Sequence, residues 1–351
     1  MTLEITKLGF IILASLFIFF VYSKINKLHK KSLDPHQMYS SDFLGSPIGG
    51  HIVFLFLLFF NFYLDYQELF FLFSIFLLGT LSDYKLFNSP KYRLLFQILI
   101  IITFVIFSKL NIESTRIQLV DQILENKFIN IGFTAFCILI VINGSNFIDG
   151  LNGLTLGYYI ILLLLLLNSN FDLINNFDKN ILVNLFFLLV VLIIANFMGI
   201  VFLGDNGSYL LGFLFSIYLI KIHQINNDIS PYFIILLLWY PCFEILFSII
   251  RKFFLKVAAI DPDTDHLHQL IFLYFILKLK IKKKLLANNL SSLIINMYNF
   301  PIFLIGMMNY NNTNLQIILI SINLTVYTII YLILKKLKKN NLISFFKIQF
   351  N

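Results

Sequence analysis

Four polar segments interrupt an otherwise apolar sequence, and they carry the residues that could do chemistry. Each combines Asp, Asn or His with Gly or Pro, and they run through 79–97, 143–154, 202–208 and 262–269. Acidic residues at the ends of apolar spans are costly and usually mark a functional site. Two or three carboxylates beside the backbone N–H groups of Gly-rich turns suit a Mg²⁺–diphosphate site, since Mg²⁺ takes few protein oxygens and the rest from phosphate. Together the four segments predict such a site.

Each segment alone has a simpler interpretation. Asn-Gly and Asp-Gly pairs are common in turns because they tolerate positive φ. The sequence contains no Gly-x-x-x-x-Gly-Lys-Ser/Thr motif, so it is not a P-loop protein. His266 and His268 have the spacing of a metal site, but the neighbouring Asp residues and the absence of Cys favour a phosphate or substrate contact over zinc.

The elements that must position these segments are membrane helices. Hydrophobic residues make up 59% of the 351 residues and charged residues only 13%, which predicts an all-α integral membrane protein with a single domain over 1–351. The first apolar run has no cleavage site after it, so we expect it to be retained. The pattern predicts about eleven transmembrane helices, near 8–22, 48–63, 68–82, 94–108, 131–145, 154–169, 181–197, 208–222, 231–250, 288–307 and 317–335.

The basic residues predict the orientation. Twenty Lys and Arg residues fall on one set of loops and six on the other, which places the N-terminus outside and the C-terminus in the cytoplasm. All four polar segments then lie on the cytoplasmic face. The tail 335–351 is basic and weakly amphipathic, and we interpret it as a membrane-surface anchor.

Charge and cysteine usage exclude other classes of protein. The net charge of +8 comes from Lys residues beside apolar spans, which favours topology and anionic lipid over nucleic acid as the cause. Cys137 and Cys242 lie in apolar runs without metal-ligand spacing, so we expect small core residues rather than a disulfide or a zinc site.

At the polar segments the chain resembles the polyprenyl-phosphate N-acetylhexosamine-1-phosphate transferase family, from about Ser46 to Gln269. The order and approximate spacing of five motifs are those of the family. They are Pro47-Ile48-Gly49-Gly50; Ser89-Pro90-Lys91-Tyr92-Arg93 with Gln97; Asn146-Phe147-Ile148-Asp149-Gly150-Leu151-Asn152-Gly153-Leu154; Phe202-Leu203-Gly204-Asp205-Asn206-Gly207-Ser208 with Leu211-Gly212; and Asp263-Thr264-Asp265-His266-Leu267-His268.

The resemblance implies a reaction and a set of partners. A lipid phosphate attacks the β-phosphorus of a UDP-N-acetylhexosamine, giving a polyprenyl-diphospho-sugar and UMP at the cytoplasmic face of the bacterial inner membrane. The cofactor is then Mg²⁺, with Mn²⁺ as a substitute, and a homodimer is left open. Such chemistry depends on positioning and on charge neutralisation.

The resemblance also implies residue roles. Asp205 and Asp83 are implied as metal ligands and catalytic residues, together with Lys91 on a phosphate and with His266 and His268 closing the site. Substrate contacts are implied for Asn146, Asp149, Asn152, Phe202 and Asp263, with Phe202 stacking on uracil and Asp149 and Asn152 shaping the nucleotide pocket.

Three departures from the family pattern stand out. Ser82 precedes Asp83 where two adjacent acids are usual, Thr264 replaces a common Arg, and Glu244 stands where Asp is common. A phosphate monoester has a second pKa near 6 and is mostly dianionic at neutral pH, so the loss of one acid does not remove a required base. Glu244 is either functional or paired with Arg251 or Lys252 on the following turns.

Two alternatives remain. A secondary transporter would carry acids near the bilayer midplane in repeated halves, whereas these acids gather at one face and no repeat is found. Within the family, the muramoyl-pentapeptide branch is the other alternative, although the His266-Leu267-His268 and Ser89-Pro90-Lys91 stretches look more like the N-acetylglucosamine branch that starts O-antigen, capsule or related glycans. The sequence does not name the sugar or the glycan.

Overall fold

The computed structural model describes residues 47–60, 66–87, 89–169, 176–256 and 265–349, and within them all regular elements are helices. Their bounds in chain order are α2 (Gly49–Phe60), α3 (Tyr66–Asp83), α4 (Pro90–Ser108), α5 (Gln118–Leu124), α6 (Lys127–Ile148), α7 (Leu154–Leu167), α8 (Asn176–Phe197), α9 (Gly204–Ile225), α10 (Pro231–Leu237), α11 (Trp239–Phe254), α12 (Leu267–Leu277), α13 (Lys284–Met308) and α14 (Thr313–Gln349).

Nine of the expected membrane helices each coincide with one described helix, a tenth falls on the bent pair α10 and α11, and the first, 8–22, lies outside the described residues. By length and composition, five described helices can cross a membrane, or six if the bent pair α10 and α11 counts as one span. These properties are those of an integral membrane protein. Two stretches expected as loops instead contain the short helices α5 and α12. The apolar residues Leu267, Leu270, Phe272 and Phe275 of α12 are buried, whereas α5 buries only Leu124.

The helix expected over 231–250 is wrong as a single rod. It breaks at Leu238, and its halves α10 and α11 meet at an angle of 76°. Pro241 explains the break, because its missing N–H cannot bond the carbonyl of Leu237 four residues earlier. The Tyr158 hydroxyl of α7 donates to that carbonyl at 2.6 Å, so the released group is satisfied inside the protein.

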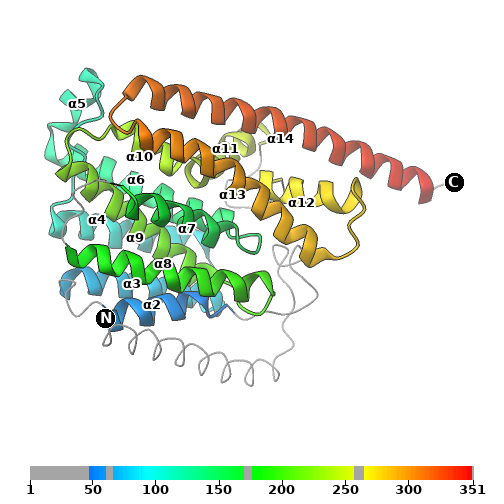
Figure 1. The fold of residues 1–351 in the computed structure, drawn as a ribbon, viewed down its shortest axis with the longest axis horizontal. Helices are drawn as coiled ribbons and strands as arrows, with labels where there is room; N and C mark the ends of the chain where they lie inside the picture. Colours follow the sequence, from blue (N-terminus) through cyan, green and yellow to red (C-terminus); the bar gives the residue numbers. More distant parts are fainter. Residues whose placement is uncertain (1–46, 61–65, 88, 170–175, 257–264, 350–351) are drawn as a thin grey trace.

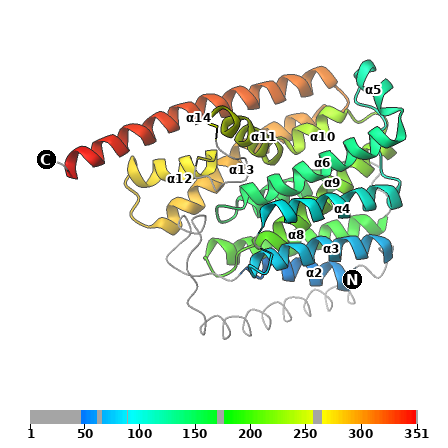
Figure 2. The same ribbon diagram turned by 180° about the vertical axis from the view of Figure 1, so that it is seen from behind.

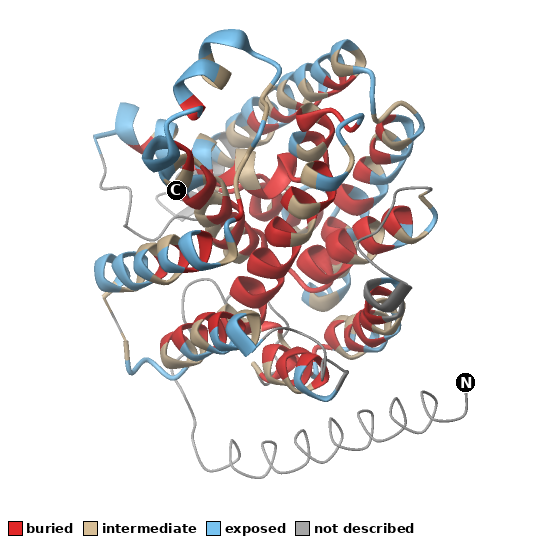
Figure 3. Cartoon of the chain, turned by 90° about the vertical axis from the view of Figure 1, so that its left-hand side faces the viewer, coloured by how far each residue is buried: buried red, intermediate tan, exposed pale blue. Residues whose placement is uncertain are grey.

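Most helices lie side by side in one bundle, with α14 along one edge and α5 at one end (Figures 1 and 2). Viewed along the bundle, buried residues gather in the middle and exposed ones on the rim (Figure 3). The central helix is α9, which packs against α2, α3 and α6. In an apolar stretch of 18 residues, 72% of α9 is buried, against 22% of α4. The outer face of α4 carries exposed side chains such as Leu99 and Phe107, which suit contact with lipid.

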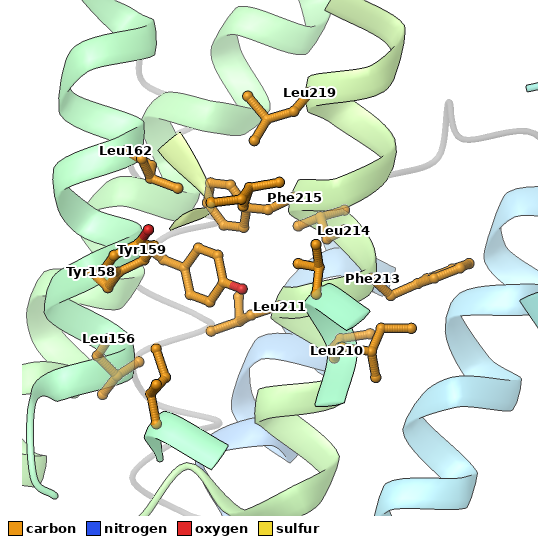
Figure 4. Close-up of a cluster of buried hydrophobic side chains, with 14 of the residues drawn as sticks. Leu156, Tyr158, Tyr159, Leu162, Leu210, Leu211, Phe213, Leu214, Phe215 and Leu219 are labelled. Carbon is orange, nitrogen blue, oxygen red and sulfur yellow. The ribbon is translucent and has the colours of Figure 1, made fainter. Parts of the chain in front are cut away.

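Two kinds of contact bring α9 close to its neighbours. Aromatic packing joins it to α7, where the rings of Tyr159 and Phe215 stack with centroids 4.3 Å apart (Figure 4). Small residues allow closer approach to α3, because a Cβ on Gly79 would lie only 2.4 Å from the Cα of Asn206. The α3–α9 contact therefore places the end of α3 directly beside the start of α9.

Candidate active site

The site begins where α3 ends against the N-terminus of α9. The Asp83 carboxylate accepts hydrogen bonds from the backbone N–H groups of Asp205, at 2.9 Å, and of Asn206, at 3.1 Å. Helix N-termini leave such N–H groups unsatisfied and carry a partial positive charge, so an acid there stabilises the helix. Gly204 precedes them with φ +78°, a conformation that favours glycine.

The Asp205 side chain is the centre of a polar network. Its Oδ1 accepts a hydrogen bond from the Asn146 amide of α6 at 2.7 Å. Its Oδ2 accepts from the Ser82 hydroxyl of α3 and forms an ion pair with Arg93 of α4 at 3.1 Å. With 28% of its side chain exposed, Asp205 keeps access to solvent. Four helices thus contribute to one carboxylate.

Arg93 is a component for which the sequence predicted no role. Its side chain is 26% exposed, and its guanidinium donates to the Ser82 hydroxyl as well as to Asp205. The sequence signal was present, since Arg93 belongs to the Ser89-Pro90-Lys91 motif, and Pro90 starts α4 just before it. Ser82 stands where the family usually has an acid, so Arg93 has one carboxylate fewer beside it. Its ion pair is with Asp205.

Asp149 lies at the end of α6, immediately outside the helix, as its C-cap residue. Burial raises the pKa of its carboxyl well above the usual range, and the negative charges of Asp205 and Asp83 raise it further. Three of the four carboxylates predicted as site residues, Asp83, Asp149 and Asp205, therefore share one electrostatic environment. Such a cluster of acids favours a bound cation or a positively charged neighbour.

The loop after Asp149 is held by asparagines that the sequence analysis missed. Asn288 of α13 accepts the backbone N–H of Asn152 at 2.7 Å, and Asn196 of α8 accepts that of Gly153. Asn296 of α13 donates to the carbonyl oxygen of Gly153 at 3.0 Å. The signal was an asparagine inside an apolar span, where an unpaired amide is costly and so indicates a partner.

Asn196 links this loop to the next polar segment. Its amide donates to the carbonyl oxygen of Val201 at 2.7 Å, one residue before Phe202. Phe202 is half-buried, and its own carbonyl accepts the N–H of Gly49 at 2.9 Å. The structure therefore places Phe202 beside the start of α9, next to the residues predicted for the nucleotide pocket.

The two histidines lie at the start of α12, and both are buried. The His266 ring lies at right angles to the Phe147 ring, with centroids 5.2 Å apart, and parallel to the His268 ring, with centroids 5.6 Å apart. A Cβ on Gly150 would lie 2.8 Å from the Nε2 atom of His268. The structure thus brings both histidines against the segment that contains Asn146 and Asp149.

Of the two remaining predicted residues, one is exposed and the other lies outside the described residues. Lys91 is exposed in the first turn of α4, two residues before Arg93. Asp263 lies outside the described residues. Asp265, which follows it, forms ion pairs with Lys335, at 3.7 Å, and with Lys338, both on α14.

The donor set can be compared with what Mg²⁺ requires. In the described part of the chain, no group of three or more His, Cys, Asp and Glu residues is arranged to hold a metal ion. A carboxylate offers about four lone-pair sites. The hydrogen bonds above occupy two at Asp83 and three at Asp205, so both keep capacity. Because Mg²⁺ commonly takes one or two carboxylates and completes its shell with phosphate oxygens, these residues fit a cation shared with a substrate.

Comparison with known proteins gives the family. The model of glycosyl transferase family 4 matches residues 67–223. The chain is 28% identical over 211 residues to the "Probable undecaprenyl-phosphate N-acetylglucosaminyl 1-phosphate transferase" of Bacillus subtilis (strain 168), covering 56% of this chain and 55% of that protein. It therefore spans about half the length of that relative.

A second relative is matched over more of its length. The chain is 30% identical over 257 residues to the "Undecaprenyl-phosphate alpha-N-acetylglucosaminyl 1-phosphate transferase" of Thermotoga maritima, which covers 71% of this chain and 77% of that protein. The matched region of the family model contains Asp83, Arg93, Asn146 and Asp205, the residues that the structure joins in one network. The family predicted from the motifs is confirmed: this chain belongs to glycosyl transferase family 4, with the polyprenyl-phosphate hexosamine-1-phosphate transferases.

Proposed function

We propose that this protein transfers an N-acetylhexosamine-1-phosphate from a UDP-sugar to a polyprenyl phosphate such as undecaprenyl phosphate. The observation that carries the proposal is the network around Asp205, in which α3, α4, α6 and α9 place carboxylates and a guanidinium together at one end of apolar helices. Both matched relatives are named for this reaction with N-acetylglucosamine. A lipid phosphate held at the membrane can reach a site at this end of the helices.

The residues of the site have distinct tasks in this reaction. A phosphate oxygen of the lipid attacks the β-phosphorus, and the bond from that phosphorus to the UMP oxygen breaks. The lipid phosphate is mostly ionised at neutral pH, so the Ser82–Asp83 pair does not need to remove a proton. Arg93 supplies positive charge beside the transferring group, and Asn146 holds Asp205 in place.

Magnesium is part of this proposal. Held by Asp205 and Asp83, Mg²⁺ or Mn²⁺ would neutralise charge on the diphosphate. We expect EDTA to abolish activity and either cation to restore it, because the available ligands are hard oxygens. Activity that survives exhaustive chelation would rule out a dissociable cation.

The proposed substrate roles are supported by the positions of the polar segments. Asp149 and Asn152 lie in the loop held by α8 and α13, and Phe202 lies beside the start of α9, so together they form the proposed uridine pocket. Lys91, exposed near Arg93, is the proposed phosphate contact, and His266 and His268 close the site. Asp263 is proposed as a further substrate contact on sequence alone.

The membrane arrangement extends the same proposal. We infer eleven spans with the N-terminus outside, the C-terminus in the cytoplasm and the site facing the cytoplasm of a bacterium. Support comes from the polar network, which joins the end of α3, the start of α4, the end of α6 and the start of α9, as alternating spans require. A reporter fused after Asn351 should be cytoplasmic, and a periplasmic signal would contradict this topology.

The test of function is a substrate panel. Purified protein in proteoliposomes with undecaprenyl phosphate and Mg²⁺ is given labelled UDP-N-acetylglucosamine, UDP-N-acetylgalactosamine or UDP-N-acetylmuramoyl-pentapeptide. We expect lipid-linked label and stoichiometric UMP with an N-acetylhexosamine donor. Turnover with the pentapeptide donor alone would assign the muramoyl branch, and uptake of intact nucleotide sugar without UMP release would indicate a transporter instead.

A further inference from the structure

Glu244 occupies a buried position on α11 that the proposed chemistry leaves without a task. It is only 1% exposed. Its Oε1 lies 2.9 Å from Nδ1 of His266 and accepts the backbone N–H of Leu267 at 3.3 Å. Its Oε2 accepts the Tyr327 hydroxyl of α14 at 2.8 Å. Both carboxylate oxygens are therefore engaged by groups other than Arg251 and Lys252, the basic residues considered as partners from the sequence.

The contact with Glu244 determines how the His266 ring can act. An ionised carboxylate only accepts hydrogen bonds, so Nδ1 of His266 must carry a proton. That assignment leaves Nε2, on the far side of the ring from Glu244, as the nitrogen that can meet another group. Because His266 is only 4% exposed and its ring contacts the rings of both Phe147 and His268, it has little room to turn away.

Tyr327 gives the carboxylate its own support. Its ring packs against Phe243 with centroids 4.8 Å apart, and its hydroxyl fixes the oxygen that His266 does not use. Three helices, α11, α12 and α14, therefore meet at one buried carboxylate. The position of α12, whose N-cap residue is His266, depends on this junction and not only on the α12 sequence.

We propose that Glu244 is a positioning residue that acts through His266: it keeps Nδ1 protonated and holds Nε2 turned toward the site. The proposal rests on the function proposed above, in which His266 closes the site. Tyr327 orients Glu244 in turn. Neither Glu244 nor Tyr327 contacts substrate in this account, and both control the reaction only through the orientation of the ring.

A double-mutant cycle tests this directly. Glu244→Leu removes the acceptor, and we expect it to lower kcat about tenfold or more with little change in KM for the UDP-sugar. Glu244→Gln retains an acceptor oxygen and should restore much of the rate. In a His266→Ala background, Glu244→Leu should cost no more than about twofold further, because the residue through which it acts is gone. An equal loss in both backgrounds would overturn the proposal.

Matched tyrosines provide the control. Tyr327→Phe removes only the hydroxyl on Glu244 and should lower kcat measurably. Tyr331→Phe, one turn later, removes a hydroxyl that accepts from Arg251 instead, and it should leave kcat near wild type. Should Glu244→Leu fail to fold, the cycle is run with Tyr327→Phe. If the loss of kcat in Tyr327→Phe is the same with and without His266→Ala, the proposal is also overturned.

A second readout does not require turnover. In protein labelled with ¹⁵N-histidine, the signal that disappears in His266→Ala should report a protonated Nδ1, and it should shift in Glu244→Leu but not in Tyr331→Phe. An unchanged His266 signal in Glu244→Leu would refute the positioning role. If the wild type shows this signal yet transfers no sugar, the proposed function fails while the orientation of His266 by Glu244 stands.

Discussion

Asp83 and Asp205 are joined through the backbone, with the Oδ1 atom of Asp83 accepting the N–H of Asp205 at 2.9 Å. Asp83 thus caps the central helix, while the Asp205 side chain turns away from that cap to Arg93 and Asn146. The two carboxylates lie close without bonding to each other. One therefore positions the helix that carries the other, and the two should respond differently to substitution.

Replacing the two neighbouring residues Ser82 and Asp83 should separate these tasks. Asp83→Ala removes both hydrogen bonds to α9, so we expect severe loss of transfer and about 1–2 kcal/mol of stability, as for other helix caps. Ser82→Ala removes one hydroxyl and should be mild. Transfer at saturating lipid and thermal unfolding of the two variants check this. A Ser82→Ala enzyme as inactive as Asp83→Ala would show that the hydroxyl is itself catalytic.

Asp205→Asn should abolish transfer and leave the protein folded. The amide keeps the volume of the side chain but removes the charge that faces Arg93 and the proposed cation. Because the Arg93–Asp205 pair is partly exposed, its loss should cost less than about 1 kcal/mol of stability. Activity at limiting Mg²⁺ and the melting temperature are the measurements. Near-wild-type activity under that condition would refute a metal role for Asp205.

Asp149→Asn should stabilise the folded protein at neutral pH. Burial raises the pKa of Asp149, so the folded protein holds this proton more tightly than the unfolded chain does. The stability that this proton gives is complete below about pH 4, where the unfolded chain is protonated as well. It is lost as the pH rises through the pKa of the folded state. The amide imitates the neutral form at every pH. Its melting temperature should exceed that of the wild type at pH 7.5, with a difference that shrinks toward pH 4.

Asp121 supplies the control of opposite sign for that pH series. Although burial raises its pKa, hydrogen bonds from Thr115 and Ser114 lower it overall. Its contribution to stability is therefore present at neutral pH and lost on acidification. Asp121→Asn should lower the melting temperature at pH 7.5 and have less effect near pH 4, and the same direction of change in both variants would contradict the assigned environments.

Removing a buried asparagine from α13 should loosen the loop after Asp149. Asn296→Ala removes an amide that donates to the carbonyl of Gly153, which keeps only the N–H of Gly157, so we expect a loss of about 0.5–1.5 kcal/mol and a raised KM for the UDP-sugar. Asn309→Ala, at an exposed hydrogen bond of the C-cap residue of the same helix, should change neither. Equal effects of the two substitutions would show that the loop does not depend on this contact.

The sequence by itself determined the class of protein, the places of most helices and the family. Whether a stretch is apolar depends only on residues that are adjacent in the sequence. Helices such as 208–222 and 288–307 could therefore be predicted without knowing what packs on them. The Asp83, Asn146 and Asp205 motifs were recognisable for a related reason, because each is a short local pattern. Even Pro241, which breaks the predicted 231–250 helix, is visible in the sequence, but whether a membrane helix tolerates a proline depends on partners such as Tyr158.

Only the tertiary structure decided which of these residues meet. Ser82 and Asp205 are 123 positions apart, and their contact exists because Gly79 lets α3 approach α9. The same holds for Glu244, whose partners His266 and Tyr327 come from two other helices, and for Asn296, which reaches a loop 143 positions earlier. Such pairs follow from the free energy of packing whole helices together, which no local stretch of sequence contains.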